Sequence, residues 1–200
     1  MTNRALIEIE RTIAPAGLIL RGGFHPQLSD AVPSLPDGRA ARSVVLVGNA
    51  GPAMWRAFAM RETTMETRNP LDEWLRPTLL AAATGTGAHA VFPNEGPPFV
   101  PIQQWGARAE PIYRSPIGIM IHPEYGLWHV YRAAFLFAER IDLPEREFAP
   151  SPCDACAQKP CLRVCPADAF LPDRFDGASC VSHVTSENGL NCRERGCLAR

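Results

Sequence analysis

Cysteine is confined to one end of this chain. The first 152 residues contain none, and all seven cysteines lie between residues 153 and 197. An odd number of cysteines in a chain without a secretion signal argues against a disulfide framework and favours metal or redox chemistry. We therefore treat every one as a candidate metal ligand: Cys153, Cys156, Cys161, Cys165, Cys180, Cys192 and Cys197.

The first four cysteines have the spacing C-x2-C-x4-C-x3-C, and Pro166 follows the last of them. Bacterial ferredoxins use a related run, C-x2-C-x2-C-x3-C-P, whose thiolates hold iron-sulfur clusters. Proline after the fourth cysteine fixes φ and removes a backbone donor where the chain turns away from the cluster. The pattern predicts an iron-sulfur site, with [4Fe-4S] as the expected cluster type.

A structural zinc site is the alternative for the same cysteines. A C-x2-C pair and a second pair of cysteines can place four thiolates tetrahedrally around Zn²⁺. Four cysteines within 13 residues, the C-x3-C-P ending and three further cysteines fit zinc less well. We therefore expect iron and keep zinc as the alternative.

Composition excludes several classes of partner. The chain has 200 residues, of which 46% are hydrophobic, and this is enough for a buried core. Its 20 basic and 21 acidic residues are interspersed and give a net charge of −1, so we expect no nucleic-acid partner. The N-terminus lacks the features of a signal peptide, and no apolar stretch is long enough to span a membrane. We expect a cytoplasmic protein without a membrane partner.

Residues 1–145 show an alternation of helical and strand patterns. The aliphatic run Val44–Val47, bounded by glycines, predicts a buried central strand followed by a helix. Such alternation favours the α/β class, here in an α+β form with helices flanking a sheet. Pro144–Pro152 predicts a linker. We therefore divide the chain into an α/β domain, residues 1–145, and a small iron-sulfur module, residues 150–200.

Local patterns give the expected boundaries. Helices are expected over 3–14, 54–65 and 71–83, with a kink or break at Pro77. Strands are expected over 17–20, 44–47, 89–92, 117–121 and 127–137, with Gly22-Gly23 in a turn. The last two strands flank the turn 122–126 and should pair with each other, although 127–137 is alternatively part helix. The expected core aromatics are Trp105, Trp128, Tyr131 and Phe135.

Four residues before the cysteines are candidates for cofactor contact. Gly48, Asn49 and Gly51 follow the central strand, where backbone N–H groups at a helix start stabilise a phosphate. An ordinary strand-to-helix turn is the alternative. Tyr125 lies in the turn 122–126. Its phenol is a candidate proton donor to a reduced substrate, and the alternative is that its ring only anchors the turn.

We expect four of the histidines to form hydrogen bonds rather than to bind metal. We expect His25, His122 and His129 to be hydrogen-bonding residues of the fold rather than metal ligands. His183 lies three residues after Cys180, inside the cysteine region. We expect its ring to form a hydrogen bond to a cluster sulfur.

Three stretches near the C-terminus carry a family resemblance. They are SPIGIMIHPEYGLWHVYRAAFLFAERIDLP from Ser115, CDACAQKPCLRVCPADAF from Cys153, and CVSH from Cys180. Together, residues 115–197 resemble the C-terminal halves of epoxyqueuosine reductases and reductive dehalogenases, where a similar strand and turn precede a two-cluster ferredoxin segment. Gly23–Pro26 and Pro70–Trp74 also look like the cobalamin-processing protein of vitamin B12 trafficking. The resemblance implies a cobalamin-dependent reductase superfamily fold, with a nitroreductase-like mixed sheet and a ferredoxin-like segment.

The same resemblance implies how the cysteines divide between two clusters. Cys165 would share one cluster with Cys180, Cys192 and Cys197. The three leading cysteines would hold the other cluster with an eighth cysteine, which is expected beyond Arg200. Without that thiolate, they would bind a [3Fe-4S] cluster or a water-ligated iron. The alternative is a single cluster held by the three leading cysteines and one later cysteine.

The resemblance implies an iron-sulfur electron-transfer protein or oxidoreductase. Its partner would be a redox protein or a small-molecule cofactor, and cobalamin or a related corrinoid at the edge of the sheet is the implied second cofactor. The alternative is a non-catalytic cofactor-binding protein whose iron-sulfur or zinc site only holds the fold. No residue is assigned as catalytic.

Overall fold

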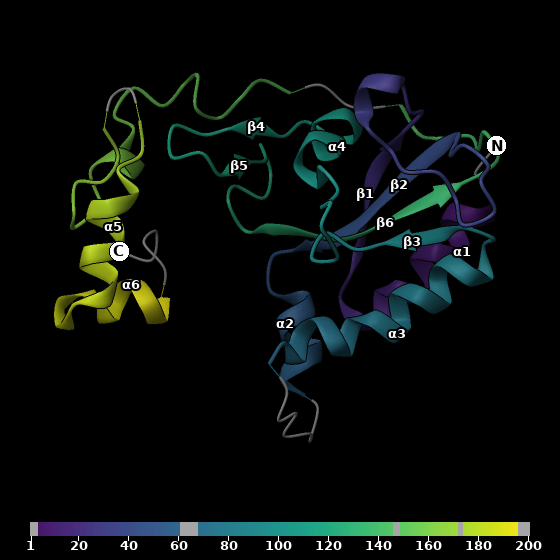
Figure 1. The fold of residues 1–200 in the computed structure, drawn as a ribbon, viewed down its shortest axis with the longest axis horizontal. Helices are drawn as coiled ribbons and strands as arrows, with labels where there is room; N and C mark the ends of the chain where they lie inside the picture. Colours follow the sequence, from purple (N-terminus) through teal and green to yellow (C-terminus); the bar gives the residue numbers. More distant parts are fainter. Residues whose placement is uncertain (1–3, 61–67, 146–148, 172–173, 196–200) are drawn as a thin grey trace.

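A computed structural model describes residues 4–60, 68–145, 149–171 and 174–195. Within these ranges the chain forms six α-helices, six β-strands and four 3-10 helices (Figure 1). In chain order they are α1 (Arg4–Ile13), η1 (Ala14–Ala16), β1 (Ile19–Phe24), η2 (Leu28–Asp30), β2 (Ser43–Ala50), α2 (Ala53–Ala59), α3 (Pro70–Gly85), β3 (His89–Val91), α4 (Ile102–Ala109), β4 (Tyr113–Arg114), β5 (Met120–Ile121), β6 (His129–Phe137), η3 (Pro160–Leu162), α5 (Gly177–Thr185), η4 (Glu187–Gly189) and α6 (Leu190–Arg195).

Four strands form the central sheet in the order β1-β2-β6-β3. All three pairings are antiparallel, and the longest joins β2 to β6, from Ser43 opposite Phe137 to Ala50 opposite His129. The expected mixture of helices and strands is confirmed. The expected mixed sheet is wrong for the described strands, because helices interspersed along a chain can also cover an antiparallel sheet.

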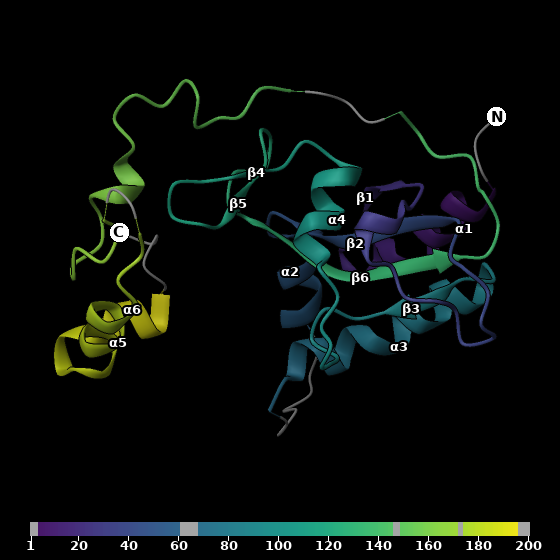
Figure 2. The same cartoon turned by 45° about the horizontal axis from the view of Figure 1, so that its top comes forward.

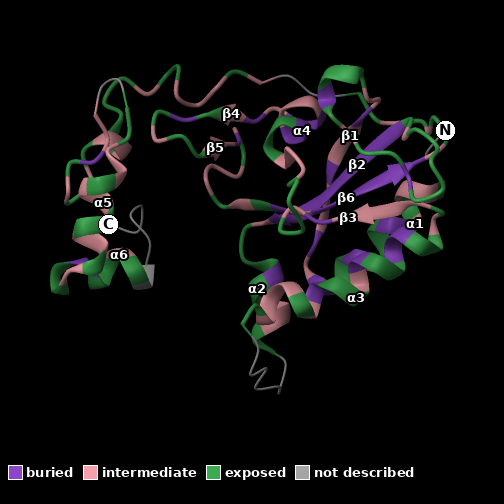
Figure 3. Ribbon diagram, in the orientation of Figure 1, coloured by how far each residue is buried: buried purple, intermediate pink, exposed green. Residues whose placement is uncertain are grey.

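The sheet is covered on both faces, and β2 contributes to both. Val45 and Val47 pack with residues of α1 and α3, whereas Val44 and Leu46 pack with residues of α4. Successive side chains of a strand point to opposite faces, so a continuous aliphatic run indicates a strand buried on both sides. Figure 3 shows this burial along β2 and β6. The central strand predicted over Val44–Val47 is confirmed.

The first strand differs from its prediction. β1 begins at Ile19 and continues through Gly22 and Gly23, which we expected in a turn. Its register with β2 shifts between Leu20 and Gly23, which indicates a bulge. At Gly22, φ is +76° and a Cβ atom would lie 2.6 Å from the carbonyl oxygen of Ala109. The glycine therefore serves a bulge and a close approach of α4 rather than a chain reversal.

Helices α1 and α3 match their predicted positions within a few residues. The break expected at Pro77 does not occur, because α3 is continuous from Pro70 to Gly85. Pro77 is exposed, so its ring and the missing N–H lie on the solvent side of the helix. The helix predicted over 54–65 is shorter, because α2 ends at Ala59, and residues 61–65 of that prediction lie outside the described residues.

The predicted pairing of 117–121 with 127–137 is wrong. β5 pairs with β4 in a separate two-stranded ribbon, and β6 pairs with β2 and β3. A single bridge between His122 and Gly126 remains of the expected hairpin. Alternation of apolar residues predicts a strand, but it does not identify the neighbouring strand.

The chain after β6 crosses to the other side of the molecule before the cysteines begin. Figures 1 and 2 show this crossing, and in both views α5 and α6 lie beyond the β4–β5 ribbon, away from the central sheet. The Tyr113 hydroxyl donates a hydrogen bond to the carbonyl oxygen of Ala149. Among the expected core aromatics Trp105, Tyr131 and Phe135 are buried, whereas Trp128 is 70% exposed.

Leu46 tests the two-sided burial of β2. It is fully buried, so Leu46→Ala should lower the free energy of unfolding by about 2–5 kcal/mol through lost burial and a residual cavity. Leu28→Ala is the matched control because the Leu28 side chain is fully exposed, and it should change stability by less than about 0.5 kcal/mol. Urea unfolding measures both. Equal effects would contradict the described core.

Candidate functional site

Side chains suited to chemistry lie in two regions. The first is the cysteine segment, defined as residues 149–195. The second is a polar cluster at one end of the central sheet, made of Arg21, Glu110, His122, His129 and Tyr131. The sequence predicted the first region, and it did not predict the second.

Turns and short helices position the cysteines. Cys153 and Cys156 precede η3, Cys161 lies in η3 and Cys165 follows it. Later, Cys180 lies in α5 and Cys192 in α6, and Cys197 lies outside the described residues. The six described cysteines are free thiols rather than disulfide partners.

Cys165 is the most buried of the six described cysteines. It is buried, and its Sγ accepts a hydrogen bond from the backbone N–H of Ala169, with 3.4 Å between N and Sγ. Hydrogen bonds to sulfur stabilise the negative charge of a thiolate and tune a bound cluster. The surroundings of Cys165 therefore suit a metal-ligating thiolate.

His183 has a buried ring nitrogen. Its Nε2 has no hydrogen-bond partner among the described residues. Residues three apart on a helix are neighbours, so His183 and Cys180 share one side of α5. A buried polar atom without a partner costs about 1–3 kcal/mol. The nitrogen fits the predicted hydrogen bond to a cluster sulfur, which stays a prediction.

The described side chains do not by themselves form a metal centre. Across the described ranges, no three His, Cys, Asp or Glu side chains lie close enough together to hold a metal ion. The structure therefore does not bring Cys165, Cys180 and Cys192 together, and the fourth member of that predicted set, Cys197, is not described. The donor types fit an iron-sulfur cluster. The division of the cysteines between two clusters stays a prediction.

The cysteine segment has very little core of its own. Among its described residues, only Cys165, Ala169 and Gly189 are buried. Its aromatic pair, Phe170 and Phe175, has ring centroids 5.2 Å apart, but Phe175 is 54% exposed. A segment of this size normally needs disulfides or a metal in place of a hydrophobic core. The described part of this segment therefore gains little stability from hydrophobic burial of its own.

The predicted cofactor residues after the central strand have backbone roles. β2 extends to Ala50, so Gly48 and Asn49 lie within the strand, opposite Tyr131 and Val130. A Cβ atom on Gly48 would lie 2.1 Å from the carbonyl oxygen of Val130, which explains the glycine by close strand approach. Only Gly51 lies in a turn, with φ of +62°. The strand-to-helix turn expected over 48–51 is therefore shorter, and a cofactor role for these residues stays a prediction.

The polar cluster is built around a buried ion pair. Arg21 of β1 is 1% exposed and donates two hydrogen bonds to Glu110, from Nε at 3.0 Å and from Nη2 at 2.5 Å. Its Nη1 donates to the backbone oxygen of Asn49 at 3.3 Å. The Tyr131 hydroxyl also donates to Glu110. A buried charge pair is tolerated when further hydrogen bonds of this kind satisfy both partners.

Hydrogen bonds assign the neutral form of both histidines in this cluster. His129 Nε2 lies 3.2 Å from the carbonyl oxygen of Met120 and must donate, so Nδ1 accepts from Arg21 Nη2 at 3.3 Å. His122 Nδ1 accepts the backbone N–H groups of Glu124 and Tyr125 at 3.0 and 3.3 Å. Its Nε2–H therefore faces Glu110, 3.9 Å from Oε2. The expectation that both are hydrogen-bonding residues is confirmed.

Tyr125 is held at the half-buried edge of this cluster. Its ring stacks on His122 with centroids 4.4 Å apart, and the Arg21 guanidinium carbon lies 5.2 Å from its centroid. Burial and the neighbouring Glu124 carboxylate raise the pKa of the Tyr125 phenol. The phenol therefore stays protonated at neutral pH, as a proton donor must.

Sequence reasoning missed Arg21 and Glu110. The other residues of the Arg21 strand are apolar residues or glycines. A single charged residue in such a strand is the only sequence feature that could have indicated a buried functional role. Glu110 follows the last residue of α4 and gives no signal. Their partnership across 89 residues depends on the tertiary fold.

Neither protein-family models nor curated proteins gave a match to this chain. In the described part of the chain, the helices lack the combination of length and apolar character that crossing a membrane requires.

His129 makes stability depend on pH. Burial and the Arg21 charge lower the pKa of His129 in the folded state, so the unfolded chain binds more protons near the ordinary value of about 6.5. Stability should therefore be greatest above that pH and fall as the pH decreases below it. His129→Gln keeps one donor and one acceptor without the titration, and it should reduce this dependence. His122, whose pKa burial also lowers, accounts for the part that remains. Urea unfolding between about pH 8 and pH 5 measures it. An unchanged dependence in His129→Gln would refute the assignment.

Proposed function

We propose that this protein is an iron-sulfur electron-transfer protein or oxidoreductase whose cysteine segment holds the cluster. One observation carries the proposal: the cysteine segment contains six of the seven cysteines, the first four of them with ferredoxin-like spacing, and it buries only three residues among those described. A bound iron-sulfur cluster supplies one-electron transfer. The residues of this chain would hold the cluster and tune its reduction potential.

Thermodynamics supports the proposal. Where a metal site is absent from the unfolded chain, the free energy of metal binding becomes free energy of folding. Such a contribution would offset the missing hydrophobic core of the cysteine segment. Free thiols, in place of disulfides, leave the described cysteines available as ligands.

Particular residues would hold and tune the cluster. The seven cysteines are the proposed ligands, and hydrogen bonds from the Ala169 N–H and the His183 ring would stabilise charge near sulfur. Fewer hydrogen bonds or greater burial would shift the reduction potential. The protein would thus set the potential with its own donors.

The finer part of the proposal is that the domain before the cysteines binds or reduces a corrinoid. It rests on the resemblance of residues 115–197 to epoxyqueuosine reductases and reductive dehalogenases. Tyr125 supports it chemically, because its protonated phenol lies half-buried at the end of β2 and β6. Arg21 and His122 would hold this phenol in place.

Metal analysis tests the cysteine segment. Protein purified without oxygen should contain iron and acid-labile sulfide, and its visible absorption should bleach on reduction. Cys156→Ser and Cys165→Ser should each lower the iron content, because each removes a proposed ligand. Val181→Ser is the control, since Val181 is an exposed neighbour of Cys180. A colourless protein that contains zinc would overturn the iron assignment and favour a structural site.

The same variants separate one cluster from two. With two clusters, electron paramagnetic resonance should show one signal lost in Cys156→Ser and a different signal lost in Cys165→Ser. A single signal that survives Cys165→Ser but disappears in Cys156→Ser would refute the two-cluster division. It would instead favour one cluster on the leading cysteines.

Hydroxocobalamin tests the corrinoid part. The full-length protein should bind it and shift its visible absorption spectrum, because a bound corrinoid changes its axial surroundings. Tyr125→Phe removes only the phenol oxygen and should leave binding intact while lowering any proton-coupled reduction. An unshifted spectrum at high protein concentration would exclude corrinoid binding without affecting the iron assignment.

A further inference from the structure

One ring nitrogen accepts two backbone donors in the turn over residues 122–126. His122 Nδ1 lies 3.0 Å from the backbone nitrogen of Glu124 and 3.3 Å from that of Tyr125. In the described part of the chain, neither N–H has a second acceptor. The arrangement of this turn therefore depends on the lone pair at His122 Nδ1.

The other backbone contacts of the turn close its two ends. His122 and Gly126 exchange two hydrogen bonds at 2.9 Å, and the Trp128 N–H donates to the Tyr125 carbonyl oxygen at 3.0 Å. The Tyr125 ring itself stacks on His122 with an interplanar angle of 19°. One imidazole thus positions Tyr125 both through its backbone and through its side chain.

Protonation of His122 removes the acceptor. The Nε2 atom already carries a hydrogen, which faces Glu110, so an added proton must bind Nδ1. In the imidazolium form both ring nitrogens are donors. The Nδ1 hydrogen would then face the N–H groups of Glu124 and Tyr125, and both hydrogen bonds would be lost. The charged ring therefore cannot support the turn that the neutral ring supports.

Charged and titratable groups face His122 from several elements. They are Arg21 of β1, Glu110 at the end of α4, His129 of β6, and Glu124 and Tyr125 of the turn. Glu110 attracts a protonated ring, but its oxygens already accept from the Arg21 guanidinium and the Tyr131 hydroxyl. Attraction toward Glu110 would not restore an acceptor at Nδ1. The turn therefore loses both hydrogen bonds wherever the charged ring moves.

These surroundings favour the neutral ring while the turn is closed. Burial lowers the pKa of His122 and outweighs the Glu110 carboxylate, which raises it, and the Arg21 charge adds to the lowering. In a released turn the ring would have a pKa near the ordinary value of about 6.5. The closed turn is therefore favoured above that pH, and release becomes easier as the pH falls below it.

We propose that His122 is a positioning residue that makes the place of Tyr125 depend on pH. The neutral ring holds the turn 122–126 closed with Tyr125 stacked on it, and the protonated ring releases the turn. The inference goes beyond the proposed function, because it concerns the conformation of the turn and holds with or without a corrinoid. Where Tyr125 gives a proton to a substrate, this donor would be in place only while His122 is neutral.

Amide hydrogen exchange of the full-length protein, followed by nuclear magnetic resonance, tests the proposal. The quantity to measure is the protection factor of the Glu124 and Tyr125 amides, which corrects for the pH dependence of exchange in an unstructured chain. Between about pH 7.5 and pH 5.5, it should fall below about pH 6.5 by up to about tenfold per pH unit, because release takes up one proton. Nuclear Overhauser contacts between the Tyr125 and His122 rings should weaken over the same range.

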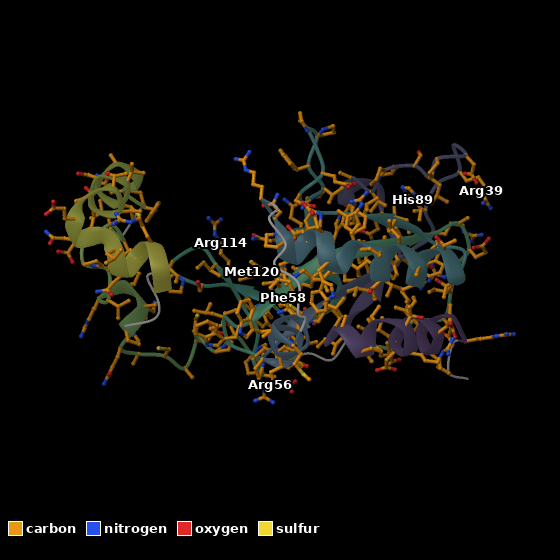
Figure 4. All side chains as sticks on the ribbon, turned by 90° about the horizontal axis from the view of Figure 1, so that it is seen from below. Arg39, Arg56, Phe58, His89, Arg114 and Met120 are labelled. Carbon is orange, nitrogen blue, oxygen red and sulfur yellow. The ribbon has the colours of Figure 1, made fainter. Side chains whose placement is uncertain are left out.

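Three variants identify the group that titrates. His122→Asn places an amide oxygen where Nδ1 lies, so it keeps the acceptor without the titration and should make the protection factors independent of pH. His129→Gln removes the neighbouring titrating ring and should leave the dependence in place. His89→Asn is the matched control, because Figure 4 shows His89 far from Met120, whose carbonyl oxygen His129 contacts.

Several results would contradict the proposal. Constant protection in the unmodified protein would refute it, and so would a fall that persists in His122→Asn. A fall that disappears in His129→Gln would assign the titration to His129 instead. Amides of β2 report global unfolding and should stay better protected than the turn at every pH, and equal protection would exclude a local release. The unmodified protein and His129→Gln decide the question where His122→Asn does not fold.

Discussion

The antiparallel pairing of β2 with β6 is the interaction on which the rest of the described fold depends. It joins Ser43–Ala50 to His129–Phe137 and places aliphatic side chains on both faces of the sheet. The helices α1 and α3 cover one face, and α4 covers the other. Because the pairing continues to His129, it also brings the polar end of β6 beside Asn49 and within reach of Arg21.

The polar cluster turns this end of the sheet into a rigid support. The Arg21–Glu110 pair joins β1 to the end of α4, and the two histidines join it to Met120 and to the turn that carries Tyr125. Removing water from two charges is unfavourable, and the added hydrogen bonds offset that cost. A network in which each partner is satisfied favours one arrangement of the surrounding loops. Tyr125 therefore has a fixed position.

The cysteine segment lacks the kind of hydrophobic core that stabilises the sheet. The sheet buries large aliphatic and aromatic side chains, whereas the described part of the segment buries one cysteine, one alanine and one glycine. A hydrogen bond from the Tyr113 hydroxyl to the Ala149 carbonyl oxygen joins it to the rest of the described chain. A cluster would supply the missing internal contacts.

Sequence reasoning predicted features that depend on local pattern. The aliphatic run Val44–Val47 indicated a two-sided strand, and the proline-led pattern from Pro70 indicated α3. It failed where partners are distant: β5 pairs with β4 instead of β6, and Arg21 meets Glu110 across 89 residues. Pro77 did not break α3 because its ring lies on the exposed side. The spacing of the cysteines predicts iron-sulfur chemistry, but the convergence of their sulfurs is a tertiary property that spacing alone does not determine.

Amide hydrogen exchange, measured with and without the metal group, tests the central claim most directly. Protein purified without oxygen should show protected amides in α5 and around Cys165, and chelation under oxidising conditions should abolish that protection. Amides of β2 and β6 should stay protected, because their stability comes from the hydrophobic core. Equal protection of residues 149–195 before and after chelation would contradict the account, since it would show that the segment holds its structure without a cluster.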